Sequence, residues 1–284
     1  MVMSKNKISI IDRVVKFFLG TKLLKNRLWI LCYHSFCDRD NQLIPTTSLD
    51  VESLVHQLNL LRYYGFTFVS GSQVEDYFYK SIQLPEYSVL LTVDDGFKNY
   101  KTKMLPVLEK FQIPSVLFVT TDYVTCEKNY SFVDWTKNDV PYPPPETVDN
   151  EFVSLTLEDM ICLGKNPLIE IGAHTCSHPF LTKIPLADAH QEILQSKKKL
   201  EEILQKEIKF FSYPHGDYSN KIISYVLKHF TLAFTVNRGS NGKYSIPHKL
   251  KRSSVKQKNN LTSLRKYILG VYDFIRLFDR LRGK

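Results

Sequence analysis

The chain has 284 residues, of which 43% are hydrophobic and 24% charged, so it can build a large core and is far from the composition of disordered proteins. One α/β barrel or two smaller domains fit this length. The net charge of +9 first suggests an anionic partner, either nucleic acid or a lipid surface. Residues 1–27 carry +6 and residues 249–284 carry +9, which leaves −6 for residues 28–248. Because nucleic-acid enzymes concentrate Lys and Arg around the catalytic centre, this acidic middle argues against nucleic acid as a partner.

The cysteines and the N-terminal segment bear on location. The five cysteines are an odd number without a CxxC pair, which favours reduced thiols and a cytoplasmic protein. Charged residues interrupt the apolar residues of the N-terminal segment and no small-residue cleavage site follows, so we do not expect a signal peptide. No apolar stretch reaches the ~18 residues of a membrane span, so we expect a soluble or peripheral protein.

Apolar runs and helical patterns alternate along the chain. The first strand is predicted at 28–34, an apolar run that ends at a histidine, and a helix follows at 49–65, where leucines recur at helical spacing. Further strands are predicted at 66–69, 88–93, 114–119, 169–172, 208–211 and 232–236, with helices at 100–111, 157–163, 186–204 and 220–229. Repeated strand-then-helix units predict a parallel α/β sheet, open or closed into a barrel. The irregular, Pro-containing stretch between 123 and 155 is interpreted as an insertion over the catalytic face.

Two pairs of polar residues directly follow predicted strands. Adjacent carboxylates at a strand end, here Asp94 and Asp95, can point in different directions, so that one binds a metal and the other acts as a base. Asp-Asp-Gly is also a common turn sequence. His174 and His178, at i and i+4, would share one face of a helical turn and bind one metal ion, unless they are incidental loop histidines.

A third group, at 212–216, contains a proline and a glycine around His215 and predicts a rigid turn that can present a backbone N–H and a ring to a ligand. The same residues also occur in ordinary turns. In parallel α/β folds the active site gathers at the carboxyl ends of the strands, so we expect all three groups and His34 on one rim.

At these residues the sequence resembles the polysaccharide deacetylase superfamily, carbohydrate esterase family 4, with its nodulation-type deacetylase homology domain. The resemblance covers residues 28–255. It rests on the segments 32–34, 94–96, 174–179, 196–200, 212–216 and 233–252. It implies an irregular (β/α)7 barrel as a single catalytic domain at 28–255, with a basic amphipathic N-terminal extension at 1–27 and a basic amphipathic C-terminal helix at 256–284.

The resemblance also implies a metal-dependent hydrolase that removes N-acetyl groups from amino sugars of a polysaccharide, oligosaccharide or glycolipid. Its divalent metal, zinc first and cobalt, nickel or manganese as alternatives, would be bound by Asp95, His174 and His178. Asp94 would be the general base that takes a proton from water. The metal and a backbone N–H of the turn would stabilise the oxyanion. The binding residues of the turn would be Tyr213, Pro214 and His215.

The sequence departs from the family pattern at two places. The family's third motif often begins with Arg and ends in Tyr, where this chain has Ser212 and His215, and we expect Arg252 to supply the missing charge to Asp94. The family's late motif with a general-acid histidine is not clearly present. We therefore expect His34, rather than the nearby His248, to protonate the leaving amine.

Several alternatives stay open. Trp135, in the insertion, either stacks on a sugar ring or packs in the core. The chain could be a catalytically silent carbohydrate-binding relative or an O-acetyl esterase. The apolar stripe of residues 261–281 either packs on the barrel or, with residues 8–19, adsorbs to anionic lipid, which would place the protein on the inner face of the membrane. The sequence does not indicate an oligomeric state.

Overall fold

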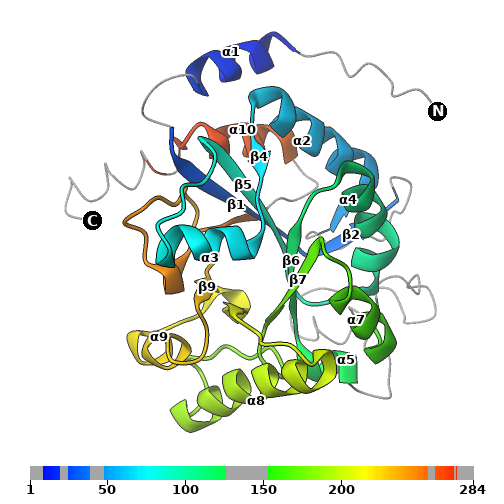
Figure 1. Cartoon of the computed structure of the whole chain (residues 1–284), viewed down its shortest axis with the longest axis vertical. Coiled ribbons are helices and arrows are strands. Elements are labelled where there is room, and N and C mark those ends of the chain that lie inside the picture. The colour runs from blue at the N-terminus through cyan, green and yellow to red at the C-terminus, as the bar shows by residue number, and fades with distance from the viewer. Residues whose placement is uncertain are drawn as a thin grey trace.

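A curled parallel sheet forms the centre of the protein. The computed structural model describes residues 9–19, 25–38, 48–125, 153–254, 260–271 and 273. The strand order is β10-β1-β5-β6-β7-β8-β9 (Figure 1). These strands are β1 (Arg27–Tyr33), β5 (Tyr87–Val93), β6 (Ser115–Val119), β7 (Ile169–Ala173), β8 (Phe210–Ser212), β9 (Leu232–Phe234) and β10 (Ser253–Ser254). The short β4 (Thr67–Phe68) pairs with the beginning of β5, and β2 (Ser35–Cys37) pairs with β3 (Ser48–Asp50).

One late segment bridges the two edges of this sheet. The N–H of Leu250 donates to Ala233 of β9 at 2.9 Å, and its carbonyl accepts from Thr235 at 2.9 Å. Two residues after Leu250, β10 lies parallel to the end of β1. The seven-strand path therefore curls into a ring, which confirms the predicted α/β barrel.

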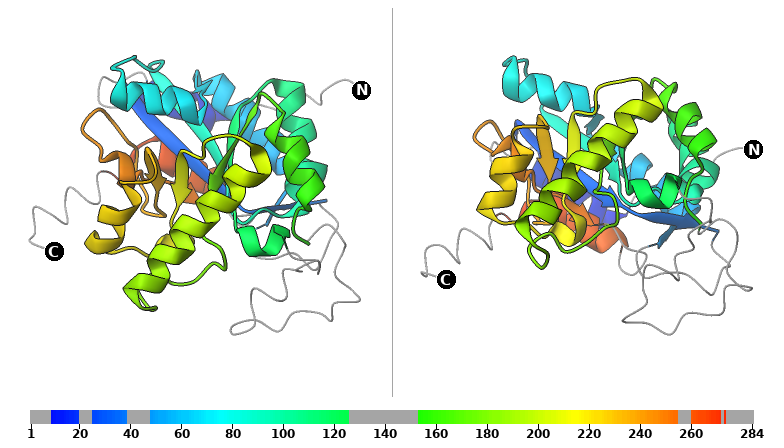
Figure 2. Two further views of the ribbon diagram at one scale, coloured as in Figure 1. Left: turned by 60° about the horizontal axis from the view of Figure 1, so that its bottom comes forward. Right: turned by 90° about the horizontal axis from the view of Figure 1, so that it is seen from below.

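Helices surround the strands on the outside (Figure 2). They are α1 (Ile10–Leu19), α2 (Val51–Tyr64), α3 (Gly71–Tyr79), α4 (Leu105–Phe111), α5 (Thr121–Thr125), α7 (Leu157–Gly164), α8 (Leu186–Leu204), α9 (Asn220–Val226) and α10 (Asn260–Ile268). Short turns of other helix types are η2 (Tyr100–Met104), η5 (Pro214–Gly216) and η6 (Pro247–Lys249). The bounds of α8 match the prediction, whereas the helix predicted at 100–111 begins as the π-helical η2. The sequence pattern missed α3, because this short helix buries only Gly71 and Val74 and so lacks an apolar stripe.

The inner face of the barrel changes from apolar to polar toward the carboxyl ends of the strands. Its apolar part includes Leu28, Ile30, Leu90, Phe210 and Leu250. Because side chains alternate along a strand, the residues two and four positions later point to the same side. Those residues are Cys32, His34, Thr92, Asp94, Ser212 and Arg252. The inward faces of the strands therefore supply both the apolar residues inside the barrel and the polar residues at its rim.

Helices α1 and α10, which lie near the two ends of the chain, are joined through Asp12. Asp12 of α1 is buried, and its Oδ1 accepts hydrogen bonds from Tyr64 of α2 at 2.5 Å and from Arg265 of α10 at 2.9 Å. In α10, Leu264, Tyr267 and Ile268 are buried, so over its described turns the apolar stripe packs on the barrel. Among the described residues, no helix combines the length and the hydropathy needed to cross a membrane.

The Asp12 contact predicts a pH-dependent contribution to stability. Burial alone would raise the pKa of Asp12, but hydrogen bonds from Ser9, Tyr64 and Arg265 outweigh it and lower the pKa from 3.8 to about 2. The ionised carboxylate therefore stabilises the fold above about pH 4, and this contribution is lost as the pH falls toward about 2. We expect Asp12→Asn to lower the free energy of unfolding by about 1–2 kcal/mol at neutral pH and by less near pH 3, measured by urea denaturation.

The matched control is Asp38→Asn, because the Asp38 side chain is 71% exposed although it pairs with Lys103 at 2.6 Å. This variant should change stability little at either pH. An equal loss in Asp12→Asn at both pH values would show that the charge of Asp12 is not what stabilises the contact.

Candidate active site

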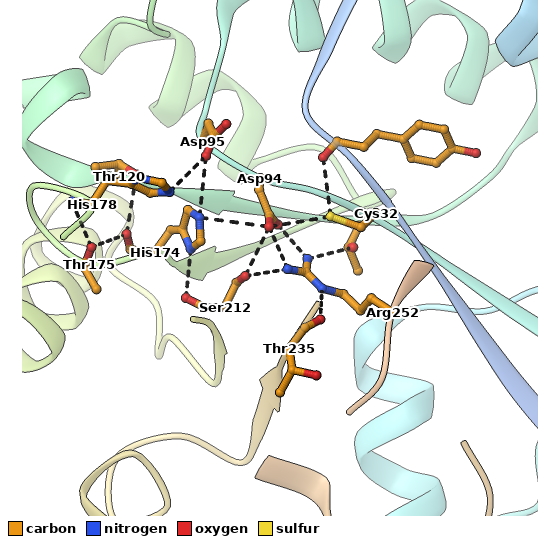
Figure 3. A network of polar contacts seen from close by, with 12 residues as sticks. Cys32, Asp94, Asp95, Thr120, His174, Thr175, His178, Ser212, Thr235 and Arg252 are labelled. Carbon is orange, nitrogen blue, oxygen red and sulfur yellow. Dashed lines mark hydrogen bonds and ion pairs between the residues drawn. The ribbon is translucent and has the colours of Figure 1, made fainter. Parts of the chain in front are cut away.

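The predicted polar residues meet at the carboxyl ends of the strands (Figure 3). Asp94 and Asp95 directly follow β5, and His174 directly follows β7. Ser212 ends β8, and Arg252 precedes β10. Asp95 and Gly96 both have positive φ, 81° and 86°, and this turn aims the two neighbouring carboxylates in different directions. Asp94 points to Arg252, and Asp95 points to the two histidines.

Three side chains are arranged as a metal-binding cluster. Asp95 Oδ1 lies 3.5 Å from Nε2 of His174 and 3.5 Å from Nε2 of His178. All three ligand atoms lie within 4.8 Å of one another. Ligand atoms about 2.1 Å from a tetrahedral zinc ion would be about 3.4 Å apart, so the spacing of this cluster fits such an ion. One carboxylate and two imidazoles leave a fourth position for a small ligand.

The loop that carries His178 differs from the expected helical turn. Residues 174–178 are irregular, and Thr175 and His178 adopt positive φ, 66° and 61°. Glu192 of α8 holds the loop, since its carboxylate accepts the backbone N–H groups of Cys176 and Ser177, both at 2.9 Å. The two histidines are therefore brought together by a strained loop fixed from α8, and not by helical spacing.

The protonation of the two histidines suits metal binding. Nδ1 of His174 donates to the Ser212 carbonyl at 2.8 Å, so in the neutral ring Nε2, which faces Asp95, carries the lone pair that a metal ion would bind. Burial and the neighbouring His174 lower the pKa of His178 to about 3, so its ring is neutral at neutral pH. Burial disfavours the charged form of His174 as well, but Asp94 and Asp95 outweigh it and raise its pKa. The two carboxylates thus favour a positive charge on or near the His174 ring. A metal cation bound at Nε2 would supply that charge in place of a proton.

Arg252 is fully buried and forms a bidentate ion pair with Asp94. Its two terminal nitrogens donate to Oδ1 and Oδ2 of Asp94 at 2.7 and 2.6 Å. The same nitrogens also donate to the hydroxyls of Thr92 and Ser212, and Nε donates to the Thr235 carbonyl at 2.9 Å. All five N–H donors of the guanidinium are therefore satisfied.

This ion pair sets the charge of Asp94. Burial would raise the pKa of Asp94, but Arg252, with His174, reverses this and holds the pKa well below its usual range. Ser212 adds a hydroxyl hydrogen bond to Oδ2 at 3.2 Å. Asp94 is therefore a fixed, ionised carboxylate beside the metal-binding cluster.

His34 lies close to Asp94. It directly follows β1 and is half-buried, and its ring lies in a group with Cys32 and Asp94 whose polar atoms are all within 4.8 Å of one another. Burial raises the pKa of Cys32, so this thiol stays protonated. His248, the other histidine considered from the sequence, has its Nε2 at 2.8 Å from the Phe230 carbonyl, a contact with the backbone outside this group.

Comparison with known proteins identifies the family. The model of the polysaccharide deacetylase family matches residues 81–232, more than half of the chain. The chain belongs to this family.

A part of the chain also matches curated deacetylases. It is 29% identical over 130 residues to the poly-beta-1,6-N-acetyl-D-glucosamine N-deacetylase of Escherichia coli K12, a match that covers 45% of this chain and 18% of that protein. The matched part thus spans less than a fifth of the relative's length.

Solved structures of deacetylases share the fold. The Streptococcus pyogenes deacetylase PplD, in complex with acetate, has a TM-score of 0.68 at 19% identity, with 85% of this chain and 98% of that chain covered. IcaB from Ammonifex degensii has a TM-score of 0.68 at 22% identity, with 86% and 97% covered. At these identities the likeness shows the fold alone, and it agrees with the deacetylase barrel expected from the motifs.

The turn after β8 presents less to the candidate site than the sequence suggests. Tyr213 is buried, its N–H donates to Phe234, and its hydroxyl donates to the His248 carbonyl at 3.1 Å, so its donors do not face the rim. Pro214 is buried and has no N–H. Only His215 remains on the open side, stacked on Phe180 with ring centroids 3.9 Å apart and 4.4 Å from the His178 ring. Trp135 lies outside the described residues.

Sequence reasoning did not find Glu192 or the role of the Ser212 hydroxyl. Glu192 lies on α8, 18 residues after His174, and no local pattern marks a glutamate that binds a distant loop. Ser212 looked like the loss of an arginine, yet its hydroxyl joins Asp94 to Arg252. One part of this arrangement was predicted from the sequence: Arg252 was expected to pair with Asp94 in place of the arginine that the family often has at position 212.

The cluster predicts that the protein binds one divalent ion per chain. His174→Gln removes an imidazole ligand and Asp95→Asn removes the negative charge of the carboxylate ligand, so zinc affinity should fall by more than the about 10- to 100-fold typical of outer-shell changes. Isothermal titration calorimetry of the metal-free chain measures this. His215→Gln is the matched control and should bind zinc as the native chain does. An equal loss in this control, or native affinity in His174→Gln, would contradict the assignment.

Proposed function

We propose that this chain is a metal-dependent hydrolase that removes N-acetyl groups from amino sugars of a polysaccharide, oligosaccharide or glycolipid. One observation carries the proposal: the Asp95, His174 and His178 cluster lies beside the buried, ionised Asp94 on one rim. Family membership supports a glycan as the substrate. The name of the Escherichia coli relative supports an N-acetyl group as the group removed.

The metal site would be held by this chain's own three side chains. A divalent ion, zinc first and cobalt, nickel or manganese as alternatives, supplies Lewis acidity that polarises the acetyl carbonyl and makes water more acidic. Asp95, His174 and His178 would bind the ion. Ser212 orients His174 through the Nδ1 hydrogen bond, and Glu192 fixes the loop of His178.

Asp94 would accept the proton of the attacking water. The guanidinium of Arg252 donates to both carboxylate oxygens of Asp94 and holds them in place, so the base is already oriented before substrate binds. The same ion pair keeps Asp94 ionised and lowers its basicity, so it accepts protons only from water of raised acidity. The backbone N–H of His215 is the remaining donor of the turn for the developing oxyanion.

His34 would give a proton to the leaving amine. Breaking the carbon–nitrogen bond of an acetamide releases a strongly basic nitrogen, which must be protonated as it departs. His34 is half-buried on the rim, and its ring lies within 4.8 Å of Asp94. The products would be acetate and an amino sugar.

The complete set of groups favours catalysis over silent carbohydrate binding. A binding protein needs neither a three-ligand cluster nor a buried carboxylate with a dedicated arginine. A buried ion pair such as Arg252 and Asp94 is often no more stabilising than well-packed apolar residues would be. The presence of this pair therefore supports a functional role for the charged carboxylate of Asp94.

Acetate release tests the function directly. We expect the zinc-loaded chain to release acetate from at least one member of a panel of N-acetylated polysaccharides, oligosaccharides and glycolipids, and a chelator to abolish the release until zinc is returned. Asp94→Asn should lower the rate about 10²- to 10⁴-fold while zinc affinity stays near native. Release from O-acetylated substrates alone would identify an esterase, and no release from any substrate at full zinc occupancy would identify a silent relative.

The pH–rate profiles of two variants test the proposed roles of His34 and Arg252. His34→Gln should lose the alkaline limb, because no group remains to protonate the amine. Arg252→Lys should keep that limb and lower kcat about tenfold or more, because a point charge cannot make the five hydrogen bonds of the fork. Its acid limb should move to higher pH, since a weaker ion pair lets the pKa of Asp94 rise. An unaltered profile would remove the corresponding residue from the mechanism.

A further inference from the structure

Helix α1 exposes an unusually apolar face. Five large apolar side chains point away from the protein, with exposed fractions from 48% for Val14 to 78% for Ile10 and Phe17. At 100° per residue these side chains lie within one arc of about 120° that contains no polar residue. They are Ile10, Ile11, Val14, Phe17 and Phe18. A helix on the surface of a soluble protein normally presents charged and polar residues there.

The outward direction of this face is fixed by contacts on the other side of the helix. Ser9 and Asp12 form a capping box, in which the Ser9 N–H donates to Asp12 and the Asp12 N–H donates to the Ser9 hydroxyl. The Asp12 carboxylate then binds Tyr64 and Arg265. Turning the apolar arc inward would expose Val15 and Leu19 and break the buried ion pair, so the exposed face belongs to the folded state.

The charge around α1 indicates what covers this face. Residues 1–27 contain seven basic residues and a single acidic one, and that residue is Asp12, which is buried and paired with Arg265. Arg13 and Lys16 are exposed on one flank of the apolar arc. A ridge of apolar side chains bordered by basic residues has the chemistry of a helix that lies in an anionic lipid surface.

We propose that α1 binds the protein peripherally to an anionic bilayer, with Ile10, Val14 and Phe17 entering the acyl boundary. The occupant is an anionic bilayer because basic residues border the apolar face, and Figure 1 shows α1 on the outside of the molecule, above α2 and α10. In α10 the corresponding apolar side chains Leu264 and Ile268 are buried, so its described turns hold α1 in place and do not themselves bind lipid.

The position of α1 also determines how the rim with the candidate site would be oriented relative to a bilayer bound at this helix. The Leu19 carbonyl at the end of α1 accepts a hydrogen bond from Tyr87, the first residue of β5, at 2.6 Å. Asp94 lies seven residues further along, at the opposite end of the strand, or about 23 Å away at about 3.3 Å per residue. A bilayer at α1 would therefore lie at the amino-terminal end of the barrel, and the rim would open away from lipid headgroups toward glycan that extends from the surface.

Flotation with liposomes tests this surface on the full chain and needs no enzymatic activity. We expect the native chain to float with vesicles of phosphatidylcholine and phosphatidylglycerol and to stay in solution with phosphatidylcholine alone. Ile11→Ser/Phe17→Ser should lower the bound fraction at least tenfold. Ile161→Ser/Leu186→Ser, which changes exposed apolar residues of α7 and α8, is the matched control and should bind as the native chain does.

Three outcomes would overturn the proposal. The first is native flotation of Ile11→Ser/Phe17→Ser, and the second is equal binding to both kinds of vesicle. The third is a dimer, seen by light scattering without lipid, that the same two substitutions dissociate, because a second copy would then cover the face. Near-native acetate release or zinc affinity in Ile11→Ser/Phe17→Ser would show that a loss of flotation is not a loss of folding.

Discussion

The buried ion pair of Arg252 and Asp94 joins the closure of the barrel to the chemistry of its rim. The two residues are 158 positions apart, and Arg252 has no exposed surface. An unpaired charge in such a place would be strongly destabilising, so each residue can be buried only because the other is present. Since Arg252 lies in the segment that bridges β9 and β1, the sheet closes and the carboxylate is oriented by the same contact.

The alternation of side chains along the strands explains why the proposed catalytic groups gather above the apolar interior of the barrel. On β1 the inner face reads Leu28, Ile30, Cys32 and His34, and on β5 it reads Leu90, Thr92 and Asp94. The apolar half fills the ring, and the polar half begins where the strands approach solvent at their carboxyl ends. A general property of parallel barrels thus places the proposed base, the candidate metal-binding cluster and the histidine proposed as acid within one small region.

The same alternation and burial of the strands determine which parts of the fold and the site could be predicted from the sequence. Strands buried on both faces are continuous apolar runs, so most were predicted within about two residues, and polar groups after each run marked the rim. Contacts between distant segments left no local trace. Glu192 binds a loop from α8, and the positive φ of His178 replaces the helical turn that i, i+4 spacing suggested. Tyr213 looked suited to ligand binding, but its neighbours take up both of its donors.

The net charge of the chain becomes informative only after its parts are placed. Arg252 belongs by sequence to the basic segment 249–284, yet it is buried and paired with Asp94. Arg265 and Asp12 are likewise paired inside the protein. On α1, Arg13 and Lys16 remain exposed beside the apolar face of the helix, which adjoins the amino-terminal end of β5. If this part of α1 meets lipid, its charge determines where the protein binds, while the charge at the rim governs the reaction. The length of β5 separates the two, so a glycan strand held away from the bilayer would reach Asp94 more readily than a sugar attached directly to a lipid headgroup.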